Sequence, residues 1–206
     1  MKDCKMYDKH ITEGIVLGKR GVGEANTLVF ILTRELGLVR AKAVSARREA
    51  SKLRYGLEPL SRGRYTFVRG KQEWRLTGVD EVSREFLGTT PAQSKRLGQV
   101  SRLLMRLVLG AEHTPELYKT VSEGFMALSH LGGDADLSRQ SEAAADSVEC
   151  VLVLRILAHL GYLPELPALA PFVEDDKFSP ELALQAAASR KLLIKLINES
   201  LQATGL

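Results

Sequence analysis

The stretch that decides the fold is Thr27-Leu-Val-Phe-Ile-Leu-Thr33, followed by Gly37 and by Leu38-Val-Arg-Ala-Lys-Ala-Val44. The first run is apolar on both faces and predicts a central strand, and the glycine predicts a turn. In the second run Arg40 and Lys42 alternate with small apolar residues, so a strand there has one basic face and one apolar face. The two runs therefore predict consecutive strands of a small sheet.

Three more short runs have the alternation of strands. They lie at Ile11–Leu17, which is followed by a glycine turn at Gly21–Gly23, at Leu60–Val68 and at Glu73–Thr77. Five short strands in about 75 residues, with a longer link between the third and the fourth, predict a small closed barrel. The five-stranded oligonucleotide-binding barrel, or OB-fold, has this architecture, and other small barrels fit the same pattern.

The pattern becomes helical after residue 86. Three hydroxyl residues, each followed by proline, predict the N-caps of helices: Thr90, Thr114 and Ser179. Gln93 completes a capping box with the first of them. Gly132-Gly133 predicts the end of the second helix.

One further helix, without such a cap, is predicted between the second and the last. It is nearly apolar, covers about Ser141–Leu160 and is expected to run through the centre of a bundle. The last helix, which Ser179 caps, covers Pro180–Gln202. The predicted fold is therefore α+β, with an OB-fold nucleic-acid-binding domain at residues 1–88 and a helical bundle domain at residues 89–206.

Positive charge is concentrated in the barrel. Residues 40–75 hold eleven basic and three acidic side chains, a net charge of +8, whereas the whole chain carries +4. A local excess of this kind attracts polyanions, above all nucleic-acid phosphates. A solvated basic face is the other interpretation of such a run.

The expected phosphate contacts come from two strands and a polar loop. Arg40, Lys42, Arg62 and Arg64 are expected to line one sheet face, and the loop from Ser45 to Gly56 to lie over it. Tyr55 in that loop is the candidate for stacking on bases, whereas Tyr65 and Trp74 are expected to be buried. The full set of predicted DNA-binding residues is Arg40, Lys42, Arg47, Arg48, Lys52, Arg54, Arg62, Arg64, Arg69, Lys71 and Tyr55.

Catalytic and metal-binding signatures are missing from the sequence. The four histidines and two cysteines have no metal-ligand spacing, and no nucleophile stands near a base. We therefore expect a binding protein that is not an enzyme and needs no cofactor or metal. Its apolar runs are too short to span a membrane and its start has no apolar signal core, so we expect a cytoplasmic protein with reduced thiols.

Several segments resemble the bacterial recombination mediator RecO family. They are Thr12–Gly18, Gly23–Ala25, Leu32–Gly37, Ala46–Arg54, Leu57–Leu60, Val68–Lys71 and Leu154–Leu166 with its Leu-Gly-Tyr-x-Pro exit. The resemblance implies an N-terminal OB-fold and a helical C-terminal domain. It also implies binding of single- and double-stranded DNA, ATP-independent annealing and the loading of RecA onto DNA coated with single-strand-binding protein. The implied partners are RecR and the acidic C-terminal tail of single-strand-binding protein.

The chain departs from this family at one place. Many members carry a four-cysteine zinc site just after the Leu-Gly-Tyr-x-Pro exit, but residues 165–179 contain no cysteine here. We expect the zinc module to be absent or reduced to a loop.

Two other classes of function fit the same residues. One is an RNA-binding or other OB-fold protein, which a preference for folded RNA over single-stranded DNA would indicate. The other is a protein–protein adaptor that uses its helical bundle, in which case DNA binding would be lost at physiological salt.

Overall fold

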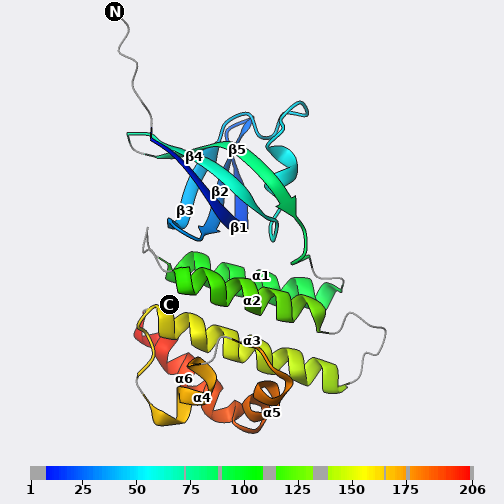
Figure 1. The fold of residues 1–206 in the computed structure, drawn as a ribbon, viewed down its shortest axis with the longest axis vertical. Helices are drawn as coiled ribbons and strands as arrows, with labels where there is room; N and C mark the ends of the chain where they lie inside the picture. The colour runs from blue at the N-terminus through cyan, green and yellow to red at the C-terminus, as the bar shows by residue number, and fades with distance from the viewer. Residues whose placement is uncertain are drawn as a thin grey trace, which may run out of the picture. The chain divides into compact units, whose positions relative to one another are not determined.

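The computed structural model describes residues 8–71, 73–87, 90–108, 115–131, 139–164, 166–174 and 177–204. The chain forms two compact units, and the first gives way to the second after Glu85. The first unit is built of strands and the second of helices (Figure 1).

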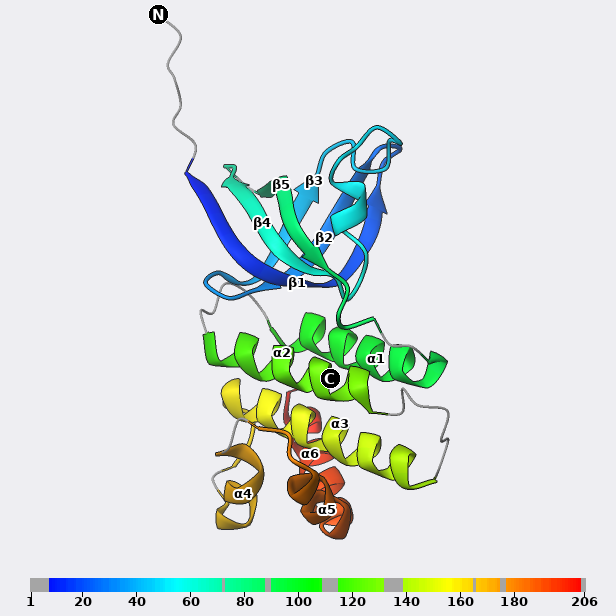
Figure 2. The ribbon, with the colours of Figure 1, turned by 45° about the vertical axis from the view of Figure 1, so that its right-hand side comes forward.

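The first unit is a closed five-stranded barrel. Its strands are β1 (Lys9–Val22), β2 (Asn26–Thr33), β3 (Gly37–Ala43), β4 (Arg62–Arg69) and β5 (Trp74–Ser83). They close in the order β1-β2-β3-β5-β4, and every pair is antiparallel except β3 with β5. This closure is visible in Figure 2. The predicted OB-fold barrel is confirmed.

The barrel core follows from strand alternation. Val29 and Ile31 of β2 and Ala41 of β3 are fully buried, as are Tyr65 and Phe67 of β4. The predicted burial of Tyr65 is therefore confirmed, and its hydroxyl donates to the carbonyl of Gly56 at 3.0 Å. Burying side chains of this size stabilises a fold by about 1.5–3 kcal/mol each.

Strand β1 is longer than the sequence pattern predicts. The turn expected at Gly21–Gly23 begins only at Gly23, because Gly21 and Val22 still pair with Thr27 and Asn26 of β2. The register of β1 against β2 shifts between Val16 and Gly18, as in a β-bulge. The first half of β1 pairs with β4, and its second half extends beyond that partner.

The second unit contains six α-helices in the described residues. They are α1 (Pro91–Leu107), α2 (Pro115–His130), α3 (Arg139–His159), α4 (Ala170–Val173), α5 (Pro180–Ala188) and α6 (Arg190–Ala203). The expectation that the apolar helix is central is confirmed, since α3 contacts each of the other five. None of the described helices is long and apolar enough to cross a membrane.

Two of the three predicted helix caps lie within the described residues, and both are formed. Thr90 and Gln93 form the expected capping box, with the side chain of each accepting from the backbone N–H of the other. The hydroxyl of Ser179 accepts from the backbone of Leu182 at 3.2 Å. The predicted cap at Thr114 and the predicted stop at 132–133 lie outside the described residues.

The last predicted helix is wrong in one respect, because it is broken. Helix α5 ends at Ala188 and α6 begins at Arg190, with the carbonyl of Ser189 accepting from the N–H groups of Leu192 and Leu193. The break folds the segment so that both halves pack against α3. Sequence periodicity runs through Ser189 without a proline or glycine to mark this bend.

A buried arginine of α3 holds part of the stretch 165–179, for which the sequence predicts no zinc module. Arg155 of α3 is 2% exposed, and its guanidinium donates to the carbonyls of Phe172 at 2.8 Å and Lys177 at 3.2 Å. It also lies 4.5 Å from the centre of the Phe178 ring. The stretch contains a 3₁₀-helix, η2 (Pro167–Leu169), as well as α4, so it is more than a loop. The described residues contain no group of three potential metal ligands.

Candidate nucleic-acid interface

A row of cations crosses the outside of the barrel. Arg20 of β1 pairs with Leu28 of β2, Leu28 pairs with Lys42 of β3, and Lys42 pairs with Arg75 of β5. Residues in register point to the same side of a sheet. Because the neighbouring Val29 and Ala41 are buried in the core, this side is the outer one.

Arg40 lies on the same outer surface, because it is two residues from Lys42 on β3. We call Arg20, Arg40, Lys42 and Arg75 the outer basic face. The guanidinium of Arg40 lies 5.9 Å from the ring centre of Phe30, its partner on β2. Phe30 is half-buried, so the outer basic face contains an aromatic ring as well as charge. In OB-folds the face of strands 2 and 3 is the surface that binds oligonucleotides.

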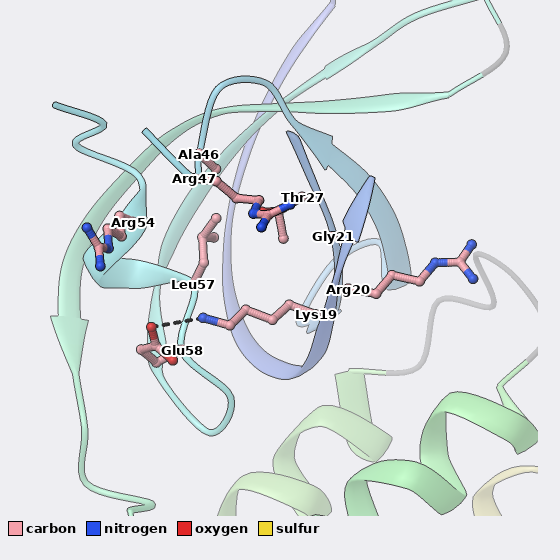
Figure 3. A pocket seen from close by; sticks show the side chains of 9 residues that line it. All are labelled: Lys19, Arg20, Gly21, Thr27, Ala46, Arg47, Arg54, Leu57 and Glu58. Carbon is pink, nitrogen blue, oxygen red and sulfur yellow. Dashed lines mark ion pairs between the residues drawn. The ribbon is translucent and has the colours of Figure 1, made fainter. Parts of the chain in front are cut away.

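A second basic surface lies on the other side of the β1–β2 ribbon. We call it the loop concavity: it has a volume of about 490 Å³ and lies between β1 and the connection from β3 to β4 (Figure 3). It is lined by Lys19, Arg20, Gly21, Thr27, Ala46, Arg47, Arg54, Leu57 and Glu58. Lys19 points into it and pairs with Glu58 at 2.8 Å, whereas Arg20 points away (Figure 3).

Arg47 fixes the β3–β4 connection against the turn between β1 and β2. Its backbone N–H donates to the carbonyl of Ala25 at 3.0 Å, and its guanidinium donates to the carbonyl of Gly23 at 3.1 Å. A Cβ atom at Gly21 would lie 3.3 Å from that guanidinium. The Ser45–Gly56 loop is therefore attached beside the loop concavity. The expectation that this loop lies over the face of Arg40 and Lys42 is wrong.

The four residues expected to line one sheet face are separated. Along β5, Lys42 is opposite Arg75, whereas Arg64 is opposite Asp80 and Arg62 is opposite Ser83. At about 3.3 Å per residue, the two pairs lie roughly 17 Å or more apart along the strand. The shared face therefore does not form.

Acidic side chains surround the displaced pair. Arg62 forms ion pairs with Glu85 at 3.0 Å and Glu13 at 3.7 Å, and Arg64 pairs with Glu81 at 2.9 Å. Their charge is locally balanced, which makes this end of the barrel a weak attractor of phosphate.

The remaining predicted contacts are spread over the barrel surface. Arg69 is exposed, with its guanidinium carbon 5.4 Å from the ring centre of Trp74, and Lys71 is exposed beyond β4. Tyr55 is 68% exposed, as a stacking residue must be. The other exposed predicted cations are Arg48, Lys52 and Arg54. Whether each of these residues touches DNA stays a prediction.

Sequence reasoning missed two cations in the second half of β1, Lys19 and Arg20. Arg20 and Lys19 lie outside the basic stretch 40–75 and follow a glycine in a segment with no clear alternation. Their roles depend on the register that joins Arg20 to Lys42 through Leu28, which no local pattern reveals. Arg75 belongs to the basic stretch 40–75, but only the pairing of β5 with β3 brings it beside Lys42.

Comparisons with known proteins match the barrel residues to one family. The family model described as "Recombination protein O N terminal" matches residues 6–83. A protein named DNA repair protein RecO from Heliobacterium modesticaldum is 31% identical over 156 residues, which cover 75% of this chain and 52% of the relative. A protein of the same name from Moorella thermoacetica is 30% identical over 183 residues, covering 87% of this chain and 63% of the relative. The chain is similar to RecO proteins over most of its length.

The chain spans between about half and two thirds of the length of those two relatives. Both matches extend beyond the barrel, since each is longer than the 78 residues from 6 to 83. The helical unit is thus part of what the chain shares with RecO proteins.

The helical unit offers a different kind of surface. An ion-pair cluster joins Arg96 of α1 to Asp146 and Glu149 of α3, and Asp146 to Arg190 of α6 at 2.8 Å. Burial acts to raise the pKa of both carboxyl groups. Hydrogen bonds from Arg190 and Arg96 nevertheless bring the pKa of Asp146 below its ordinary value, whereas burial keeps that of Glu149 above it. These charges are mutually satisfied and tie three helices together.

Proposed function

We propose that this protein is a recombination mediator of the RecO type that binds single-stranded DNA on its outer basic face. The observation that carries the proposal is the row Arg20, Lys42 and Arg75, which crosses the β2–β3 side of an OB-fold barrel. Each cation neutralises phosphate charge and releases counterions. Phe30 provides a ring on which a base can stack, so binding has little sequence preference.

In this proposal the protein also binds double-stranded DNA and anneals complementary strands without ATP. Cations that hold backbone phosphates lower the repulsion between two strands, which is the main electrostatic barrier to pairing. The protein acts as a non-enzymatic mediator in the cytoplasm. Its partners are RecR and the acidic tail of single-strand-binding protein, and through them it helps to load RecA.

The test is the double variant Arg40→Ala/Lys42→Ala, measured by fluorescence anisotropy with labelled single-stranded DNA. Loss of two phosphate contacts flattens the slope of log affinity against log salt by about 1.4. The matched control is Arg102→Ala/Arg106→Ala, which removes two exposed cations from α1. The control should leave the slope unchanged, and both variants should keep their thermal stability.

Two results would contradict the proposal. An unchanged salt slope in Arg40→Ala/Lys42→Ala would place the DNA elsewhere. Stronger competition by structured RNA than by single-stranded DNA would favour an RNA-binding protein, the alternative that the sequence left open.

A further inference from the structure

The two basic surfaces of the barrel face in opposite directions. Lys19 pairs in register with Val29, which is fully buried, so its side chain is on the inner side of the ribbon. Arg20 pairs with Leu28 and through it with Lys42, so it is on the outer side. Adjacent residues of a strand point to opposite faces. One extended strand of nucleic acid lying across the outer basic face therefore leaves the loop concavity unoccupied.

The loop concavity has the chemistry of a phosphate site. Its floor is formed by buried Ala46, Leu57 and Thr27, which limit water on one side and strengthen electrostatic attraction. Arg47 is held at its edge by two hydrogen bonds. A guanidinium has five N–H donors, and among the described residues Arg47 uses one of them, to Gly23.

The remaining charges of the concavity also favour an anion. Arg54 forms no ion pair with any described residue and is exposed. Lys19 is paired with Glu58, and both side chains are partly exposed, at 34% and 46%. An ion pair of this exposure is weak, so a phosphate can take the place of the carboxylate. Glu58 is the one acid among the lining residues.

We propose that the loop concavity binds the phosphate backbone of a second nucleic-acid strand while the outer basic face holds the first. The proposal rests on the proposed function in taking the outer basic face as the first-strand site. It gives a single barrel two strand-binding surfaces separated by the β1–β2 ribbon. One chain can then hold two strands before they pair.

The test is a titration of the full chain with a short labelled oligothymidine, which cannot pair with itself. The wild-type protein should bind two strands per chain at low salt. Lys19→Ala/Arg54→Ala should bind one, with the first step within about twofold of wild type. Arg40→Ala/Lys42→Ala, the matched variant with the same charge change, should lose the first, tighter step and keep the second. Circular dichroism of each variant checks the fold.

Several outcomes overturn the proposal. Two strands bound by Lys19→Ala/Arg54→Ala would mean that the concavity holds no strand. An equal loss of the first step in both double variants would mean one merged site. Suppose that an acidic peptide binds the wild-type protein but not Lys19→Ala/Arg54→Ala, while both proteins bind the same number of strands. The concavity would then belong to a protein partner. If Arg40→Ala/Lys42→Ala alone kept its first step, the outer-face assignment would fail while the concavity assignment stood.

The carboxylate that competes with the second strand gives an independent check. Glu58→Gln releases Lys19 and should strengthen the second step by about two- to fivefold. Its matched control is Glu73→Gln, because Glu73 pairs with Lys42 of the outer basic face at 3.6 Å. That variant should strengthen the first step only. Strengthening of the first step by Glu58→Gln would contradict the separation of the two surfaces.

Discussion

At the scale of single residues, Arg155 determines the structure of the segment after α3. Its guanidinium satisfies the carbonyls of Phe172 and Lys177 from a position that is 2% exposed. Removing such a group leaves buried acceptors without donors, and the penalty exceeds the lost hydrogen bonds. The arginine thereby stabilises the segment between α3 and α5.

Arg155→Met should therefore lower the free energy of unfolding by about 3 kcal/mol. Arg155→Lys should recover only part of this, because an ammonium group lacks the planar fork of a guanidinium. Urea denaturation followed by circular dichroism measures both. The control is Arg102→Met on the exposed side of α1, which should change stability by no more than about 0.5 kcal/mol. Equal effects at the two positions would contradict the role given to Arg155.

Cys150 is a second residue whose environment sets its chemistry. Burial raises the pKa of its thiol to about 11, from an ordinary value near 9. Since the folded thiol holds its proton more tightly than the unfolded one, its stabilising contribution is full below pH 9. The contribution is lost as the pH rises toward about 11.

The thiol should accordingly react slowly in the folded protein. At pH 8 its thiolate fraction is roughly 100-fold smaller than that of a free cysteine. The measurement is the labelling rate of the Cys4→Ser variant with a thiol-reactive disulfide, with and without denaturant. Labelling of the native protein at the rate of free cysteine would show that Cys150 is not protected.

At the scale of elements, close approach of strands limits which residues fit. A Cβ atom added at Gly14 of β1 would lie 2.6 Å from Cγ2 of Ile31 and 3.2 Å from the carbonyl oxygen of Leu32. At Gly98 in α1 the nearest atom would be the Arg102 guanidinium at 3.8 Å. The same substitution therefore has opposite consequences in the two elements.

Gly14→Ala should destabilise the protein by about 1–3 kcal/mol through overpacking. Gly98→Ala should stabilise it by up to about 1 kcal/mol, because alanine is the better helix former. Thermal unfolding of the two variants side by side measures the contrast. A stabilised Gly14→Ala protein would indicate that the barrel wall relaxes more easily than its packing implies.

At the scale of the whole molecule, charge divides between the two parts of the chain. Residues 1–85 carry a net charge of +7 and residues 86–206 carry −3. Each part has a core of its own, one inside the barrel and one around α3. The division predicts that nucleic-acid binding belongs to the barrel.

A fragment of residues 1–88 should therefore bind single-stranded DNA, more weakly than the full chain, whereas residues 89–206 should not bind it. Anisotropy titrations of both fragments at equal ionic strength test this, with circular dichroism to establish that each is folded. DNA binding by the helical fragment with the affinity of the full chain would contradict the electrostatic assignment.

Local patterns in the sequence determined the elements of this protein. Alternation at Leu38–Val44 and around Tyr65 predicted strands with the correct buried faces, and Thr90 with Gln93 predicted a helix start. These signals are local, because strand alternation, caps and apolar stripes act between residues only a few positions apart. The same patterns missed the break at Ser189, where packing of both halves against α3 overrides an unbroken helical periodicity.

Which cations lie side by side depends on the closure of the barrel. The sequence placed Lys42 with Arg62 because both lie on basic strand faces, but barrel closure puts them opposite different ends of β5. Barrel closure instead places Arg20 in line with Lys42 across β2. It also places Lys19 in the loop concavity together with Arg47. Strand alternation determines which residues share a face within one strand. The register between strands, which the closed barrel sets, determines which residues of different strands lie side by side.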